Sequence, residues 1–309
     1  MESIIKPFVS EIQRYRVHIR AINSIEMPEY AGSALRGAFG HALKDMACLS
    51  ALQNKGKCVC RVEDACVYQQ LFSPAAQQSS SLSRQYDVSP PIIVQAHALP
   101  EVLEAGNSAC FEMVCLGERA NTQWPIIQLA LQRALMGGIA WPHPVRGRAQ
   151  LSQVETLNVD PAPVHNMPSR MHIQLLGHTR LQHTGHILTA AVWQAEHWLK
   201  AALRRQTLMQ DAYHLGLPSI HWPDIQADVD AIIWCDAQLH DVDWTRYSNR
   251  QQQAMPLNGV GGTFVLEHVS PAIQALLHYG QWLHVGKNSV FGLGQYQIVS
   301  STAESFPSS

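Results

Sequence analysis

The chain runs through the same order of elements twice, strand–helix–strand–strand–helix–strand. Alternating apolar and polar residues mark the strands, and apolar residues at helical spacing mark the helices. This order suits a ferredoxin-like unit. The sequence therefore predicts an α+β chain of two tandem ferredoxin-like (RRM-like, βαββαβ) domains.

Each half supplies four strands and two helices to this prediction. In the first half we expect strands at 14–25, 90–94, 109–116 and 150–157, and helices at 34–48 and 125–135. In the second half we expect strands at 170–176, 230–235, 263–266 and 295–299, and helices at 189–215 and 270–280. Proline-rich residues 160–163 are the best linker candidate. The expected domains are thus 1–160 and 161–300, followed by a disordered tail at 301–309.

Composition limits the classes of function. The hydrophobic fraction of 46% is that of a globular protein, and no apolar run is long enough to span a bilayer. Seven cysteines without a secretory signal favour the reducing cytoplasm. The net charge of −2 argues against electrostatic binding of nucleic acid over the whole protein surface, so any RNA-binding surface must be local.

A glycine-rich stretch at 283–296 precedes the last predicted strand. Glycine lets a backbone approach a ligand closely, and exposed N–H groups beside a lysine suit phosphate oxygens. The stretch is not a P-loop, because the order of its residues differs and a strand follows it. The alternative is a plain turn before the strand. The candidate phosphate-binding residues are Gly286, Lys287, Asn288, Ser289, Gly292 and Gly294.

The first predicted helix, at 34–48, has two distinct faces. One face is an apolar stripe formed by Leu35, Phe39, Ala42 and Met46. The other face carries Gly37, His41, Lys44 and Cys48. The helix therefore offers an imidazole and an ammonium group side by side.

Four segments together resemble a known family. They are the helix segment 34–43, the cysteine-rich segment 58–72, the basic segment 246–251 followed by glycines at 259–262, and the glycine-rich stretch. With them the chain resembles the CRISPR-associated endoribonucleases that cut precursor CRISPR RNA within its repeats, a branch of the RAMP superfamily. The resemblance implies paired ferredoxin-like domains, repeat RNA as a partner, and cleavage that requires no metal cofactor. It also allows other CRISPR effector or adaptation proteins as partners.

Metal-free RNA cleavage uses the 2′-oxygen of the substrate as the nucleophile and leaves a 2′,3′-cyclic phosphate. The protein must move two protons and stabilise charge on the phosphate. The resemblance implies His41 as general base or acid, Lys44 as the phosphate contact and Tyr30 as the residue that positions a sugar hydroxyl. His284 is a competing histidine, for which a role in orienting the glycine-rich stretch is the simpler interpretation.

Further basic residues are candidates for the RNA backbone. Arg36, Arg146 and Arg148 are the first of these, and Arg204, Arg205, Arg246 and Arg250 come after them. Most surface arginines are simply solvated, which is the alternative for each. No RNP-like aromatic run is present, so we expect RNA to be read through loops and a groove.

The cysteines have two interpretations. Cys48, Cys58, Cys60 and Cys66 could together hold a structural zinc ion. However, their C-x-C spacing matches zinc motifs poorly, so free thiols under a loop are the alternative.

Two other functions fit the same sequence. A non-catalytic RNA-binding RAMP subunit of a CRISPR effector complex would share the fold and the glycine-rich stretch. The chain could also be one domain of a larger fused CRISPR protein. His41 together with Lys44 favours the nuclease.

Overall fold

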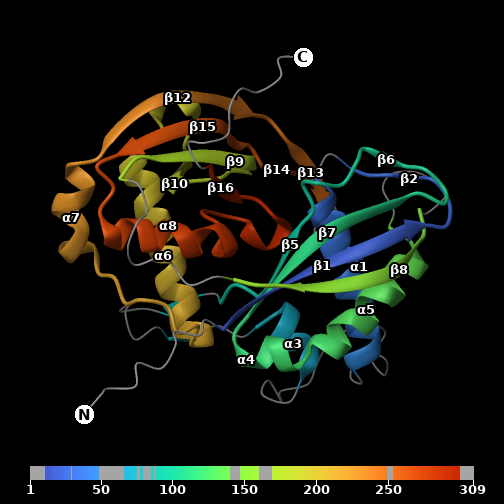
Figure 1. Cartoon of the computed structure of the whole chain (residues 1–309). Coiled ribbons are helices and arrows are strands. Elements are labelled where there is room, and N and C mark those ends of the chain that lie inside the picture. Colours follow the sequence, from blue (N-terminus) through green and yellow to red (C-terminus); the bar gives the residue numbers. More distant parts are fainter. Residues whose placement is uncertain are drawn as a thin grey trace, which may run out of the picture. The chain divides into compact units, whose positions relative to one another are not determined.

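The computed structural model divides the chain into two compact units (Figure 1). Unit 1 comprises Met1–Pro161, Leu208–Gly216 and Val290–Gly292, and unit 2 comprises the remaining residues. The structure describes residues 11–28, 30–48, 66–74, 77–78, 85–86, 88–139, 147–159, 169–248 and 253–299.

Unit 1 contains a four-stranded antiparallel sheet in the order β5-β7-β1-β8. Its strands are β1 (Ile12–Ala21), β5 (Ile92–Gln95), β7 (Ser108–Leu116) and β8 (Ala149–Leu157). Counted along the chain, this is the order second, third, first, fourth, which is the ferredoxin-like arrangement. Two main helices, α1 (Ala31–Ala47) and α5 (Trp124–Gly137), lie against one face of the sheet (Figure 1).

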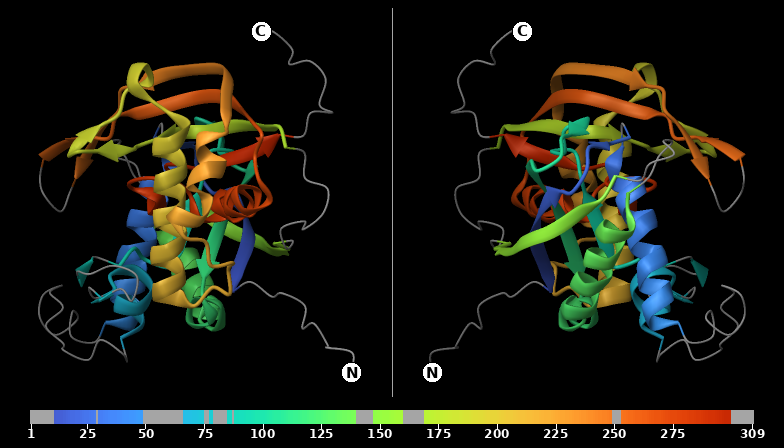
Figure 2. Two further views of the ribbon diagram at one scale, coloured as in Figure 1. Left: turned by 90° about the vertical axis from the view of Figure 1, so that its left-hand side faces the viewer. Right: turned by 90° about the vertical axis from the view of Figure 1, so that its right-hand side faces the viewer.

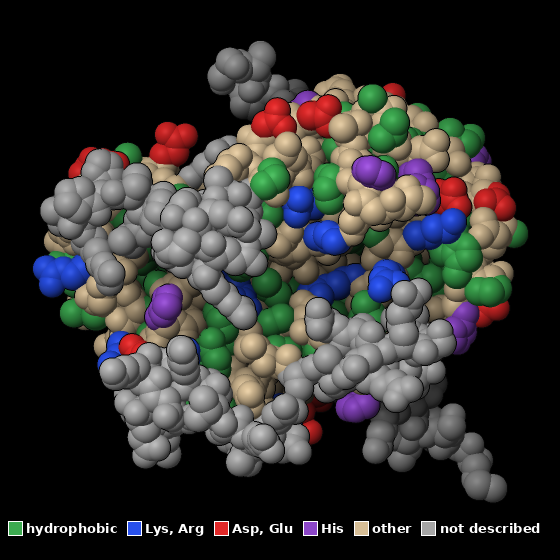
Figure 3. Space-filling view, turned by 180° about the vertical axis from the view of Figure 1, so that it is seen from behind, with side chains coloured by type: hydrophobic (Ala, Val, Ile, Leu, Met, Phe, Trp, Pro, Cys, Tyr) green, Lys and Arg blue, Asp and Glu red, His purple; other side chains and the backbone are tan. Residues whose placement is uncertain are grey.

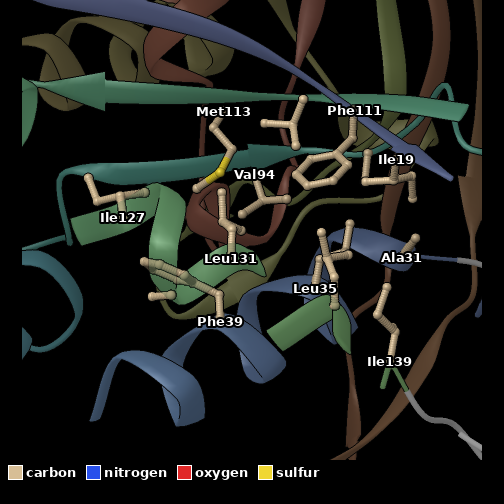
Figure 4. Packing of buried hydrophobic residues seen from close by; sticks show 14 of the residues in the cluster. Ile19, Ala31, Leu35, Phe39, Val94, Phe111, Met113, Ile127, Leu131 and Ile139 are labelled. Atoms are coloured by element: carbon tan, nitrogen blue, oxygen red, sulfur yellow. The ribbon is translucent and has the colours of Figure 1, made fainter. Parts of the chain in front are cut away.

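The core of unit 1 lies between that face and the two helices (Figure 4). Phe39 of α1 and Leu131 of α5 point towards Phe111 and Met113 of β7, and all four side chains are buried. The alternating strand pattern and the apolar helix stripes therefore meet in one layer, as the sequence predicted.

Unit 2 repeats this architecture. Its sheet has the order β12-β15-β9-β16, again second, third, first, fourth. The strands are β9 (Met171–Thr179), β12 (Ile233–Val242), β15 (Gly259–Glu267) and β16 (Tyr296–Val299), and the helices are α6 (Ala195–Tyr213) and α8 (Pro271–Leu283). Trp198 of α6 is fully buried and packs edge-on against Phe264 and Tyr296. The prediction of two ferredoxin-like domains is thus confirmed.

Short elements complete the described chain. They are β2 (Ile25–Glu26), α3 (Val67–Phe72), β3 (Gln77–Gln78), β4 (Gln85–Tyr86), β6 (Val102–Leu103), α4 (Glu118–Thr122), β10 (Gln182–His183), β11 (His186–Ile187), η2 (Ala190–Val192), α7 (Trp222–Asp230), β13 (Thr245–Ser248), β14 (Gln253–Pro256) and η3 (Ser289–Phe291). The β13–β14 hairpin, drawn in orange, projects from unit 2 beyond its four-stranded sheet (Figure 2).

Several element predictions were wrong in their bounds. The expected strand 14–25 is broken at residues 22–24, where Asn23 Oδ1 accepts a hydrogen bond from the Arg148 amide. The expected helix 189–215 begins later, at Ala195, after a separate 3-10 turn. Strand β12 continues past its expected end at residue 235 to Val242, through a bulge at which Asp236 has φ 50°. Helix α7 and the β13–β14 hairpin were not predicted.

Candidate functional site

Helix α1 positions the catalytic candidates of unit 1. Leu35, Phe39 and Ala42 are buried, while His41 is exposed and Lys44 is half-buried on another side. Because residues three apart are neighbours on a helix, the His41 imidazole and the Lys44 ammonium group lie on one face. The Lys44 Nζ lies 5.9 Å from the centroid of the Tyr68 ring.

The helix does not bring Tyr30 to this pair. Tyr30 is half-buried and occupies the N-cap position, 11 residues before His41. At 1.5 Å of rise per residue, its Cα lies about 16 Å along the helix axis from that of His41. The three predicted catalytic residues therefore form a close pair and a distant third, and their roles stay predictions.

Arg36 occupies a face of α1 between two glycines. Its guanidinium carbon lies 3.9 Å from the Phe72 ring centroid and 5.5 Å from that of Phe291, and its Nη2 donates to the Phe72 carbonyl at 3.3 Å. A Cβ on Gly32 would collide with the Phe291 carbonyl, and one on Gly40 would collide with the Phe72 ring. The spacing Gly-x₃-Arg-x₃-Gly thus makes room for two aromatic residues. This buried position favours a packing role for Arg36 over a phosphate contact.

In unit 2, the glycine-rich stretch begins where α8 ends. His284 has φ 62° and is fully buried, and its Nδ1 lies 3.1 Å from the Leu293 carbonyl oxygen. It directly follows helix α8, at the C-cap position. Its ring is enclosed by protein and faces the other end of the loop, which fits the interpretation of His284 as a loop-orienting residue.

The candidate phosphate-binding residues differ in exposure. Lys287 is exposed, Asn288 is half-buried and Ser289 is 4% exposed. Gly286, Gly292 and Gly294 have φ of 91°, 93° and 71°, values that favour glycine. Lysine and arginine side chains are also exposed on the face drawn in Figure 3, which accords with local positive charge on a chain of near-zero net charge.

Two residues at the end of β9 hold neighbouring segments and were not predicted from the sequence. His178 is 1% exposed, and its Nε2 lies 2.6 Å from the Leu257 carbonyl oxygen. Arg180 Nη1 donates to Asn288 Oδ1 of the glycine-rich stretch at 2.8 Å. No local spacing signals either role, since their partners are 79 and 108 residues away in the chain.

Burial lowers the pKa of His178, and the neighbouring Arg180 charge lowers it further, against an opposing effect of the Leu257 hydrogen bond. The unfolded chain then binds a proton more readily than the folded one. Stability is therefore full above the unfolded pKa of about 6.5 and falls as the pH drops below it. We expect His178→Gln, which keeps a donor for Leu257, to lose less stability than the wild type between pH 7.5 and pH 5.5. Urea unfolding at both pH values measures this.

The matched control for that experiment is His186→Gln, because His186 is exposed on strand β11. This variant should follow the pH dependence of the wild type. Equal pH dependence of all three proteins would show that His178 does not govern acid sensitivity.

The other predicted site residues are spread over the chain. Arg148 is exposed, Arg204 is exposed, and Arg205 is buried with its Nε donating to the Leu283 carbonyl at 3.0 Å. Arg205 is thus placed to hold the end of α8. The side chains of Arg146, Arg246 and Arg250 lie outside the described residues.

The zinc prediction rests partly on residues that the structure does not describe. Cys48 is buried and Cys66 is half-buried, whereas Cys58 and Cys60 lie outside the described residues. Among the described residues no group of three or more His, Cys, Asp or Glu is arranged to hold a metal ion. A four-cysteine zinc site therefore stays a prediction.

Two family models match the chain and together span nearly all of its described length. The AF_1859_N N-terminal domain matches residues 8–178, and the CRISPR-associated endoribonuclease Cas6 model matches residues 173–296, including the glycine-rich stretch. The chain belongs to the family that the AF_1859_N model describes, and its residues 173–296 match the Cas6 endoribonuclease model. Among its described helices, none is long and apolar enough to cross a membrane.

Solved Cas6 structures share the fold. Cas6 (TTHB231) of Thermus thermophilus in a product complex has a TM-score of 0.56 and 12% identity, over 94% of this chain and 100% of that one. A Cas6 (TTHA0078) product complex has a TM-score of 0.53 and 15% identity, over 93% and 100%.

Longer proteins also contain this fold. A chain of a partial Cas6-RT-Cas1–Cas2 complex has a TM-score of 0.58 and 13% identity, over 97% of this chain and 48% of that one. This protein thus spans about half of that chain and 30% of the corresponding chain of the Cas6-RT-Cas1–Cas2 complex. No curated protein matches it.

Proposed function

We propose that this protein cleaves CRISPR repeat RNA within precursor transcripts, without a metal ion, to release guide RNAs. The observation that carries the proposal is the Cas6 endoribonuclease match over residues 173–296, which contain the glycine-rich stretch and its exposed Lys287. Unit 1 supports it with an exposed imidazole at His41 and a lysine on the same helix face.

The chemistry follows from these groups. The 2′-hydroxyl of the nucleotide before the cut attacks the adjacent phosphorus, and the bond to the 5′-oxygen of the next nucleotide breaks. The products are a 2′,3′-cyclic phosphate and a 5′-hydroxyl. His41 either accepts the proton of the 2′-hydroxyl or donates one to the leaving oxygen, and Lys44 stabilises the additional negative charge on the phosphate. Lys287 holds a phosphate away from the cut.

The decisive experiment is incubation of the purified protein with labelled repeat RNA in the presence of EDTA. We expect cleavage at one position and a 2′,3′-cyclic phosphate end. A loss of cleavage in EDTA that added Mg²⁺ restores would contradict the metal-independent mechanism. Binding without cleavage, with or without metal, would instead identify a non-catalytic RNA-binding subunit.

The longer structural relatives suggest partners. In those complexes Cas6 occurs together with RT, Cas1 and Cas2. We include CRISPR adaptation proteins among the proposed partners of this chain on that basis, with repeat RNA as the first partner.

A further inference from the structure

Three consecutive backbone carbonyls at the base of the β13–β14 hairpin are held by side chains from the end of β9. Arg180 Nη2 donates to Pro256 O at 3.3 Å and Arg180 Nε donates to Asn258 O at 2.8 Å. Between them, the His178 Nε2 donates to Leu257 O at 2.6 Å. The hairpin base is therefore fixed by residues about 80 positions earlier in the chain.

His178 and Arg180 also hold the glycine-rich stretch through their backbone. The His178 carbonyl accepts the Gly294 amide at 3.0 Å, and the Arg180 carbonyl accepts the Lys287 amide at 2.9 Å. A Cβ on Gly286 would collide with the Arg180 carbonyl, so glycine is required for this approach. The Arg180 side chain adds its bond to Asn288 Oδ1.

These contacts involve all three nitrogens of the Arg180 guanidinium. Nε, Nη1 and Nη2 each donate to a protein oxygen, two at the hairpin base and one on the glycine-rich stretch. Arginine suits this task because its planar group presents several donors in a fixed geometry, which lysine lacks. Lys287, next to the residue that Arg180 holds, is exposed and open to a phosphate.

We propose that Arg180 is a positioning residue that fixes the glycine-rich stretch and the β13–β14 hairpin relative to each other, so that unit 2 presents them to RNA as one surface. This inference rests on the proposed function. Arg180 itself does not contact a phosphate. Its removal lowers RNA affinity by releasing the two segments, whereas removal of Lys287 lowers affinity by taking away a charge.

The test compares Arg180→Met, Arg180→Lys and Lys287→Met, with Arg170→Met as the matched control. Arg170 is an exposed arginine just before the other end of β9, where it pairs with Asp236 and Glu267. In the protein without RNA, we expect Arg180→Met to speed hydrogen exchange at the amides of Lys287 and Leu257 by about tenfold, with α8 unchanged. Arg180→Lys should lie between the wild type and Arg180→Met, and Arg170→Met should match the wild type at these amides.

Binding of labelled repeat RNA over a range of salt concentrations then separates positioning from direct contact. Arg180→Met should bind about tenfold more weakly at every salt concentration, with an unchanged salt dependence. Log affinity falls as log salt concentration rises, and Lys287→Met should reduce the magnitude of this slope by about 0.7 to 0.9, as expected for one lost phosphate contact.

Two outcomes would overturn the proposal. One is unchanged exchange at the two amides in Arg180→Met. The other is a reduction, in Arg180→Met, of the magnitude of the slope of log affinity against log salt by the amount expected for one phosphate contact. That result would make Arg180 a direct ligand of RNA. Failure of the proposed function is distinguishable, because the wild type would then not cleave repeat RNA, while the exchange experiment needs no RNA.

Discussion

Replacement of His41 by alanine is expected to lower the rate of repeat RNA cleavage by about 10² to 10⁴-fold, the usual contribution of a positioned general acid or base. RNA affinity should change little, because His41 is one exposed side chain on α1 and the helix keeps its buried face of Leu35 and Phe39. Single-turnover cleavage and filter binding measure the two quantities separately.

His186→Ala is the control for that variant. His186 is exposed on β11 of unit 2, and no catalytic role is proposed for it. Its variant should cleave at the wild-type rate. Should His41→Ala also cleave at that rate, His41 would have no part in the mechanism.

The largest expected loss of stability comes from Gly294→Ala. Gly294 has φ 71°, and an added Cβ would collide with the Val285 carbonyl oxygen. It would also lie 2.8 Å from the Val285 carbonyl carbon and 2.9 Å from the Val285 backbone nitrogen. All three are backbone atoms, so no side chain can move aside. The Gly294 carbonyl also accepts the Val285 amide at 2.9 Å, which fixes the two segments at this distance. We expect destabilisation of about 3 kcal/mol or more, measured by urea unfolding.

Gly37→Ala is the matched control for this change. Gly37 lies within α1, and an added Cβ there would meet no atom within 4 Å. We expect a gain of up to about 1 kcal/mol, because alanine favours a helix over glycine. Similar urea midpoints for Gly294→Ala and the wild type would mean that the two ends of the glycine-rich stretch are not packed as closely as described.

The sequence predicted the elements whose local pattern agrees with their environment. Helix α1 shows its buried stripe directly, and β7 and α5 have clear alternation or helical spacing. Strand β12 was recognised in part, because much of it is exposed and a bulge at Asp236 interrupts its alternation. The spacing of apolar residues indicates which face of an element is buried, so a largely exposed strand shows little of this pattern.

The candidate site was predictable to a similar extent. Exposure of His41 on a helix face and of Lys287 beside glycines agrees with the expectations from local spacing. The roles of Arg36 and Arg180 could not be inferred, because they depend on partners distant in sequence, such as Phe291 and Asn288. A sequence shows that an arginine is present, and only a fold shows which groups its donors reach.

The glycine at position 32 has a consequence for comparing related chains. The Phe291 carbonyl occupies the space that a side chain at position 32 would need. A homologue with alanine or a larger residue at the corresponding point of its first helix must therefore route its final loop along a different path. That single helix position thus offers a way to sort homologues by loop path before any of their structures is determined.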